Sequence, residues 1–215
     1  MPTSRYKHTP AILNAVLCAA PESILDVGTG FGKWGHLFRE YTDIARAEEE
    51  PERYHRPHWK VRIDGIEGHA PYITPAHEYL YDNIYIGDMT DKIREVGVYD
   101  VIFLGDVIEH AAKEEGRRVL RLCLERARKM VVVTTPPRFK EQPAVCNNPL
   151  EEHRSHWRAR DFHALAPAVT RKVVNKLVAI LFPDEAQWRA LQPAVQKALG
   201  VPLWRRLVSA VHTTR

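Results

Sequence analysis

Short apolar segments alternate with longer amphipathic ones along most of the chain, which predicts strands and helices in turn. The expected strands are Ile24–Val27, Val61–Ile66, Ile84–Ile86, Tyr99–Leu104 and Met130–Thr134. Two later segments, Val169–Val174 and Lys176–Phe182, flank a turn near Asn175 and predict a terminal hairpin. Near-continuous apolar strands are typical of a parallel sheet that is buried on both faces.

Helical patterns separate these strands. They cover Thr9–Ala20, Lys33–Tyr41, Pro71–Tyr81, Asp91–Val96, Ala112–Lys129 and Ala159–Leu165. Thr9 and Pro10 suggest an N-cap followed by a first-turn proline, and Pro21 ends that first helix. The alternation predicts an α/β fold in which helices cover both faces of a mainly parallel sheet.

Two polar stretches interrupt the pattern. Residues 42–60 are too charged to form core, and we expect a surface insertion, either a binding segment or a solvated loop. Residues 136–160 follow the fifth strand and are expected to fold over the acceptor side of a site. We therefore expect one domain over residues 1–183, followed by a helical extension over residues 184–215.

Composition narrows the class of protein. The chain has 215 residues, and no apolar run in it approaches the roughly 20 residues that span a bilayer. No signal peptide opens the chain, and three well-separated cysteines favour reduced thiols, so we expect a cytoplasmic protein. A net charge of +4 is weak evidence for a nucleic-acid partner.

The first expected strand is followed by the segment Asp26-Val-Gly-Thr-Gly-Phe-Gly32 and then by a helix. Glycines allow a tight turn and a close approach of the backbone to a ligand, and the helix start offers free N–H groups. Gly30 to Gly35 also matches the Gly-x-Gly-x-x-Gly pattern of dinucleotide-binding dehydrogenases. That alternative is less favoured, because the charged insertion delays the second strand.

Carboxylates lie at or near the ends of four of the expected strands, at Asp26, Glu67, Asp88 and Asp106. Parallel strands bring their carboxyl ends to one edge of the sheet, so these acids should lie around the glycine loop. An edge with four carboxylates disfavours a polyphosphate ligand, because both carry negative charge. It suits a nucleoside that carries positive charge, such as S-adenosylmethionine.

Four segments together resemble class I S-adenosylmethionine-dependent methyltransferases, of the bacterial small-molecule type. The glycine segment resembles their first motif, Gly65-Ile-Glu67 resembles the end of their second strand, and Gly87-Asp88-Met89 resembles the adenine corner. The segment from Tyr99 to His110 resembles the fourth-strand motif of their O- and C-methyltransferases. The resemblance implies a Rossmann-like three-layer sandwich with seven strands and an antiparallel final strand.

The resemblance also implies roles for particular residues. Asp26 would hold the ammonium of S-adenosylmethionine, and Gly28 and Gly30 would contact its methionine part. Glu67 would bind the ribose. Asp88 and Met89 would bind the adenine, and Gly105 and Asp106 would border the sulfonium and the incoming acceptor.

Two histidines are candidate bases for an acceptor hydroxyl. His110 follows the fourth strand and His153 lies in the long loop, although His110 could instead orient the next helix. Trp157 could close the acceptor pocket or pack as a structural side chain. The pairs His55/His58 and His153/His156 are not completed by a cysteine or acid cluster, so no metal is expected. One alternative stays open, a metal used for a catechol-like acceptor.

The expected function is methyl transfer to a small-molecule acceptor, with a hydroxyl as the favoured target. Two alternatives stay open: an RNA methyltransferase, suggested by the basic C-terminus, and a non-catalytic S-adenosylmethionine-binding protein. Nucleic acid and membrane are not expected partners. An apolar stripe in the C-terminal helices, with Leu203, Leu207 and Val211, allows a homodimer through those helices.

Overall fold

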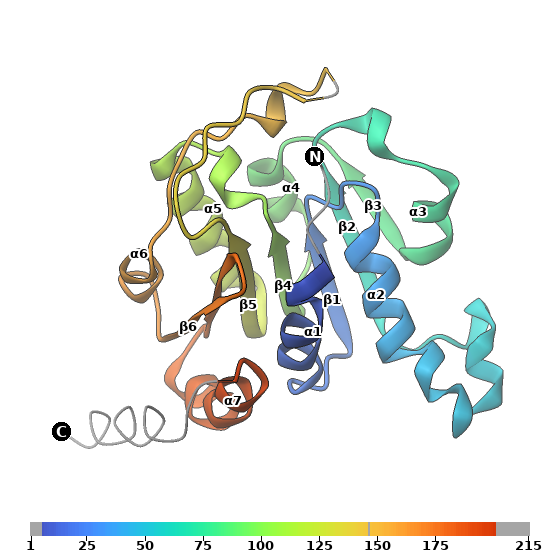
Figure 1. The fold of residues 1–215 in the computed structure, drawn as a ribbon. Coiled ribbons are helices and arrows are strands. Elements are labelled where there is room, and N and C mark those ends of the chain that lie inside the picture. The colour runs from blue at the N-terminus through green and yellow to red at the C-terminus, as the bar shows by residue number, and fades with distance from the viewer. Residues whose placement is uncertain (1–5, 146, 201–215) are drawn as a thin grey trace.

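The computed structural model describes residues 6–145 and 147–200, and a seven-stranded sheet runs through its centre (Figure 1). The strands are β1 Ser23–Val27, β2 Arg62–Glu67, β3 Asn83–Ile86, β4 Tyr99–Gly105, β5 Ala127–Thr135, β6 Ala168–Val173 and β7 Lys176–Leu181. Their order across the sheet is β3-β2-β1-β4-β5-β7-β6. The first five strands pair in parallel, whereas β7 runs antiparallel to both β5 and β6. The predicted sheet and its reversed hairpin are confirmed.

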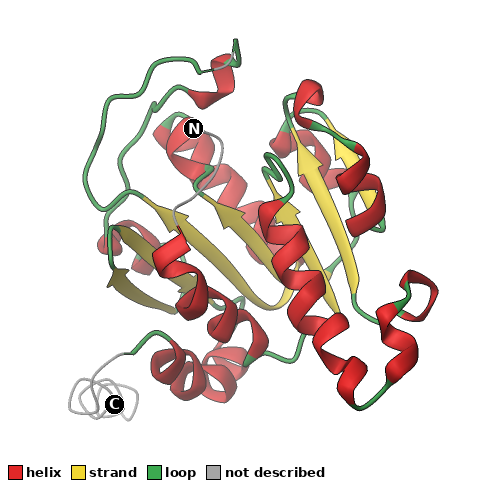
Figure 2. Cartoon of the chain, turned by 45° about the vertical axis from the view of Figure 1, so that its right-hand side comes forward, coloured by secondary structure: helices red, strands yellow, loops and turns green. Residues whose placement is uncertain are grey.

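Helices cover both faces of this sheet (Figure 2). They are α1 Thr9–Leu17, α2 Lys33–Thr42, α3 Pro75–Leu80, α4 Met89–Glu95, α5 Lys113–Arg126, α6 Ala159–His163 and α7 Glu185–Ala198. Successive residues of a strand point to opposite faces, which divides the core into two layers. Ile24 and Phe103 pack in the layer with α1, α2 and α7, and Leu25 and Leu104 pack in the layer with α4, α5 and α6.

Several details of the predicted helices are wrong. The helix expected over Ala112–Lys129 ends at Arg126, because residues 127–129 belong to β5. The helix expected over Pro71–Tyr81 is broken into a 3-10 turn, η5 Ala70–Tyr72, and α3, because Thr74 adopts an extended backbone and forms a capping box at the start of α3. At the first helix, His8 rather than Thr9 is the N-cap residue, and Thr9 is the first helical residue.

The charged insertion at 42–60 is partly core, contrary to the expectation of a purely surface segment. It forms three 3-10 helices, η2 Ile44–Glu48, η3 Pro51–Tyr54 and η4 Arg56–His58. Asp43 is fully buried and accepts hydrogen bonds from Arg39 Nη1 at 2.6 Å, Arg53 Nη1 at 3.2 Å and the Lys60 N–H at 2.7 Å. Charge is tolerated there because the buried carboxylate is paired and hydrogen-bonded.

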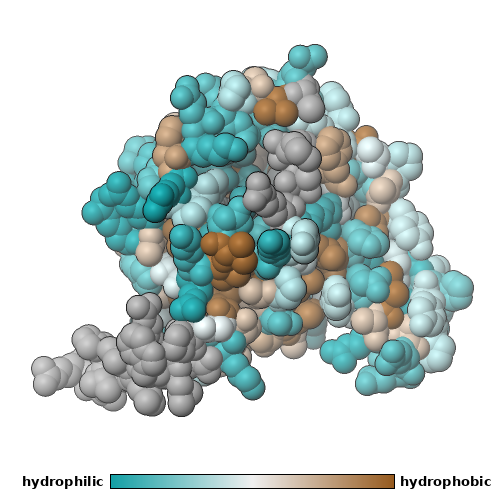
Figure 3. Space-filling model, in the orientation of Figure 1, coloured by the Kyte–Doolittle hydropathy of each residue, from teal (hydrophilic) through white to brown (hydrophobic). Residues whose placement is uncertain are grey.

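The end of the described chain packs on the domain. Helix α7 contacts α1, and the Trp188 ring meets Phe182 edge-on at 5.3 Å. The second C-terminal helix and the proposed dimer contact through it lie outside the described residues. On the face in Figure 3, hydrophobic residues form small patches among hydrophilic ones. None of the described helices is both long and apolar enough to cross a lipid bilayer.

Candidate functional site

The loops that follow the parallel strands line a cavity of about 1400 Å³. The strands are parallel and adjacent, so the loops after their carboxyl ends meet at one edge of the sheet. The predicted site residues that line this cavity are Gly28, Gly30, Glu67, Asp88, Met89, Gly105, Asp106, His110 and His153. Nine of the ten site residues predicted from the sequence therefore line one cavity.

The glycine loop after β1 is fixed by a carboxylate from β2. Glu67 Oε2 accepts a hydrogen bond of 2.8 Å from the Gly30 N–H, and its Oε1 accepts one of 2.8 Å from the His69 N–H. Gly28 has a φ of +74°, and a Cβ at that position would overlap Val107 Cγ2. Backbone conformation and close packing both require glycine there.

Asp26, the remaining candidate, lies beneath the cavity and not in its lining. Its side chain is buried, and Oδ2 accepts a hydrogen bond of 2.6 Å from the Tyr81 hydroxyl. Burial raises the pKa of this carboxyl to about 7, and the hydrogen bond from Tyr81 opposes that rise. No sequence pattern pointed to Tyr81 as the partner of Asp26, since the two residues are 55 positions apart.

Asp88 and Asp106 both line the cavity and both have structural partners. Asp88 caps α4, with Oδ1 accepting a hydrogen bond of 2.8 Å from the Thr90 N–H. Asp106 has a φ of +61°, forms an ion pair of 2.7 Å with Lys176 and accepts a hydrogen bond of 3.1 Å from Thr134 Oγ1. Lys176 begins β7, so the reversed hairpin contributes a cation to the cavity, which the sequence patterns did not reveal.

Two cavity residues at the start of α2 were missed by the sequence analysis. Lys33 and Trp34 directly follow the glycine loop, and both line the cavity. Burial lowers the pKa of the Lys33 ammonium, whose Nζ lies 5.4 Å from the centre of the Trp34 ring. Trp34 Nε1 is buried without a hydrogen-bond partner among the described residues. Their position just after the last glycine is the signal that could have found them.

The long loop after β5 is attached to the short helix η6, Ile108–His110. The backbone N–H groups of Arg154 and Ser155 donate hydrogen bonds of 2.8 Å and 3.0 Å to the carbonyl oxygen of Glu109. His153 directly precedes this pair of donors. The attachment therefore brings His153 next to His110, although the two residues lie far apart in the sequence.

Trp157 does not close the acceptor pocket. Its side chain is fully buried, stacks on Phe162 at 5.4 Å and donates a hydrogen bond of 3.2 Å from Nε1 to the carbonyl oxygen of Ile108. The structural interpretation of Trp157 is therefore correct, and its role is to anchor the long loop.

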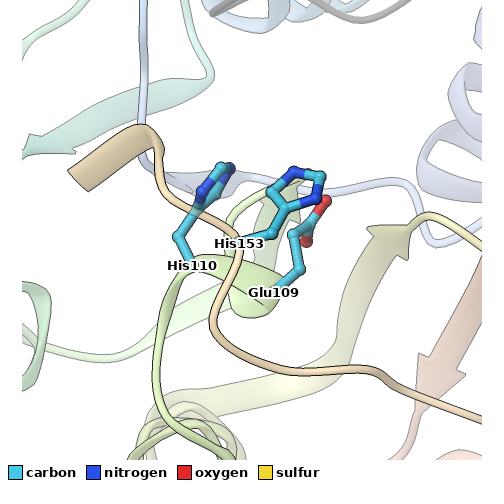
Figure 4. A group of neighbouring side chains, drawn as sticks. All are labelled: Glu109, His110 and His153. Atoms are coloured by element: carbon cyan, nitrogen blue, oxygen red, sulfur yellow. The ribbon is translucent and has the colours of Figure 1, made fainter. Parts of the chain in front are cut away.

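The two candidate bases lie side by side, with ring centres 4.9 Å apart (Figure 4). Nδ1 of His110 lies 3.2 Å from the carbonyl oxygen of Glu152, and Nδ1 of His153 lies 2.6 Å from that of Lys140. A carbonyl can only accept, so Nδ1 of each ring carries a proton, and in the neutral form of either ring the lone pair is on Nε2. Burial lowers the pKa of His110, which favours its neutral form.

An acid lies beside His110 and His153, a pair that differs from the two histidine pairs considered in the sequence. Glu109 is buried, and one ligand atom from each of Glu109, His110 and His153 lies within 4.8 Å of the others. Burial raises the pKa of Glu109 to about 8, and the nearby charge of Asp106 adds to the rise. Pairing His153 with His156 in the sequence did not reveal Glu109 as a neighbour, because Glu109 lies in η6, far from His153 along the chain.

Similar solved structures were found for this arrangement of elements. An O-methyltransferase family protein from Burkholderia thailandensis superposes with a TM-score of 0.50 and 14% identity, covering 80% of this chain and 55% of that one. A TehB-like SAM-dependent methyltransferase from Corynebacterium glutamicum gives a TM-score of 0.51 and 14% identity, covering 80% and 86%. The fold is that of SAM-dependent methyltransferases.

A third structure with this methyltransferase fold, PigF with SAH, gives a TM-score of 0.51 and 15% identity, and covers 81% of this chain. This chain spans 55% of the length of PigF and of the Burkholderia protein. No family model matches the sequence, and no curated protein does.

Proposed function

We propose that the protein is an S-adenosylmethionine-dependent methyltransferase that acts on a hydroxyl of a small molecule. The observation that carries the proposal is the cavity itself. A glycine loop, the carboxyl groups of Glu67, Asp88 and Asp106, and two histidines border one space at the carboxyl ends of the strands. The fold supports the proposal, because ligands of such sheets bind at this edge.

The lining residues fit the parts of this cofactor. Glu67 Oε1 has acceptor capacity beyond its hydrogen bond from the His69 N–H, which suits a ribose hydroxyl. Oε2 accepts from the Gly30 N–H and, at 3.4 Å, from Thr29 Oγ1, so a second ribose hydroxyl would take the place of the long Thr29 contact. Asp88 and Met89 lie on the side of β3 and offer an acceptor and an apolar contact for the adenine. A carboxylate at Asp106 and the bare backbone of Gly105 suit a neighbouring sulfonium.

The start of α2 fits the amino-acid end of the cofactor. Lys33 supplies a positive charge, and the unpartnered Nε1–H of Trp34 supplies a buried donor that a carboxylate could satisfy. In this proposal Asp26 does not contact the cofactor ammonium. It stabilises the positions of β1 and α2 through its hydrogen bond with Tyr81.

Bound S-adenosylmethionine supplies a methyl group already activated by its sulfonium. The remaining work of the protein is to orient the acceptor, exclude water and receive the hydroxyl proton. His110 and His153 are the proposed bases, because each keeps a lone pair on Nε2 and lines the cavity. The similarity in fold to the O-methyltransferase family protein from Burkholderia thailandensis and to PigF, whose structure contains SAH, supports this chemistry.

Calorimetric titration of the full chain with S-adenosylmethionine and with SAH tests the cofactor. We expect saturable binding that weakens at least tenfold in Glu67→Ala. A matched control is Glu114→Ala, since Glu114 is exposed on α5 and pairs with Arg117. Circular dichroism checks that both variants fold. Absence of binding to the wild-type chain would refute the proposal.

A second experiment tests the transfer step and the acceptor. The chain is incubated with methyl-labelled cofactor and either a small-molecule extract or total RNA, and labelled products are identified. Label in small molecules, lost in a His110→Ala/His153→Ala variant that still binds cofactor, supports the proposal. Label in RNA would show that the acceptor is RNA and not a small molecule. Binding without any transfer would indicate a non-catalytic cofactor-binding protein.

A further inference from the structure

We propose that Glu109, His110 and His153 form a binding site for a divalent metal ion on the acceptor side of the cavity. Two imidazoles and one carboxylate are a donor set that first-row divalent ions accept readily. All three residues line the same cavity, so an ion could enter from solvent and keep positions open for a further ligand.

The spacing of the donors fits such an ion. One ligand atom from each residue lies within 4.8 Å of the others (Figure 4). With metal–ligand bonds of about 2.1 Å, two ligands of one ion lie at most about 4.2 Å apart. Small side-chain rotations are enough to close this difference, because all three donors already face a common space.

Hydrogen bonds around the histidines prepare them as ligands. The Nδ1 atoms of His110 and His153 lie against the carbonyl oxygens of Glu152 and Lys140, at 3.2 Å and 2.6 Å. This contact fixes the Nδ1-protonated tautomer and leaves the Nε2 lone pair for the ion. Metal-binding histidines usually show this backbone contact on their second nitrogen.

The surroundings of Glu109 are an independent indication of a bound cation. Its side chain is 2% exposed, and its Oε2 has no hydrogen-bond partner among the described residues. A buried carboxyl oxygen without a partner is costly, and loss of the carboxyl proton with coordination of a cation would remove that cost. Lys176 adds positive charge to the cavity, but its ion pair of 2.7 Å with Asp106 offsets that charge.

Backbone hydrogen bonds connect the two segments that carry the three residues. Arg154 and Ser155 donate backbone hydrogen bonds to the Glu109 carbonyl, which joins the loop that carries His153 to the helix that carries the other two ligands. If the proposed function holds, the ion would bind the acceptor oxygen and lower the pKa of its hydroxyl. As ligands of the ion, the two histidines would give up the base role proposed above, and the hydroxyl proton would pass to water.

Titration of the metal-free full chain with Mn²⁺, followed by electron paramagnetic resonance and calorimetry, tests the site without cofactor or acceptor. We expect one bound ion per chain, and at least tenfold weaker binding in His153→Ala and in Glu109→Gln. The matched control is His58→Ala, because His58 is exposed in η4 and belongs to the other histidine pair. That variant should bind as the wild type does.

Unchanged Mn²⁺ affinity in His153→Ala, or no saturable binding to the wild type, would overturn the proposal. Glu109 is buried and its variant could misfold, whereas His153 lies in a loop and is half-buried, so its variant decides the matter. The readout does not depend on methyl transfer. Cofactor binding measured in the presence of a chelator separates failure of the metal site from failure of the proposed function.

Discussion

The Tyr81 hydroxyl donates a hydrogen bond of 2.6 Å to Asp26 Oδ2 and accepts one of 3.1 Å from the Gly35 N–H. One side chain thus joins strand β1 to helix α2, directly beneath the glycine loop. A side chain at position 35 would overlap the Tyr81 ring, so glycine is required there by packing. The geometry of the loop therefore depends on a contact outside the cavity.

Replacing Tyr81 by phenylalanine removes both hydrogen bonds and leaves a buried acceptor unsatisfied. We expect the free energy of unfolding to fall by about 1–3 kcal/mol. Urea denaturation measures this change. Tyr79→Phe is the control, because Tyr79 is 53% exposed, and it should cost less than about 0.5 kcal/mol. Equal stability of the two variants would contradict the structural role of Tyr81.

The raised pKa of Asp26 predicts a pH dependence of stability. In the folded protein its pKa is about 7, against about 4 in an unfolded chain. Between these values the folded state binds more protons than the unfolded state, so this residue makes the free energy of unfolding fall as pH rises. The main cause is burial of the carboxylate, which disfavours the charged form.

Asp26→Asn removes this titration and keeps an acceptor for Tyr81. Denaturation at pH 5 and at pH 8 should show that the wild type loses roughly 2–3 kcal/mol relative to the variant over that range. Parallel pH profiles for the two proteins would show that the carboxyl is not perturbed.

A methyl group at Gly28 should disturb the cavity. The φ of +74° disfavours alanine, and its Cβ would overlap Val107, so we expect Gly28→Ala to cost about 1–3 kcal/mol and to weaken cofactor binding. Gly97→Ala is the control, since no atom lies within 4 Å of a Cβ built there. Adding Val107→Ala should recover part of the loss. No recovery would leave backbone strain as the cause.

Much of the fold followed from local patterns. Apolar segments and glycine turns gave the strands, and parallel pairing then brought Glu67, Asp88 and Asp106 to one edge without knowledge of side-chain contacts. This inference works because the direction of a parallel strand fixes where its end lies. Residues that follow a strand directly are the ones such reasoning locates best.

Contacts between distant segments could not be predicted in this way. Glu109 and His153 meet because a loop is hydrogen-bonded to η6, and no periodic pattern encodes that attachment. Asp26 has the position of a ligand-binding acid in the sequence, but its environment depends on Tyr81. The prediction that residues 42–60 form no core was also wrong, because composition does not reveal which charges are paired.

The buried carboxylate of Asp43 should hold the charged insertion onto the domain. It pairs with Arg39 at 2.6 Å and with Arg53 at 3.2 Å, so Asp43→Ala would leave both guanidinium groups with fewer partners. Breaking such a buried network costs about 3–5 kcal/mol. The control is Asp91→Ala, whose side chain is 67% exposed and pairs with Arg94. Denaturation measures the stability of both variants. Limited proteolysis should cut residues 42–60 faster in Asp43→Ala than in Asp91→Ala. Similar stability and cleavage in both variants would show that the insertion is held by other contacts.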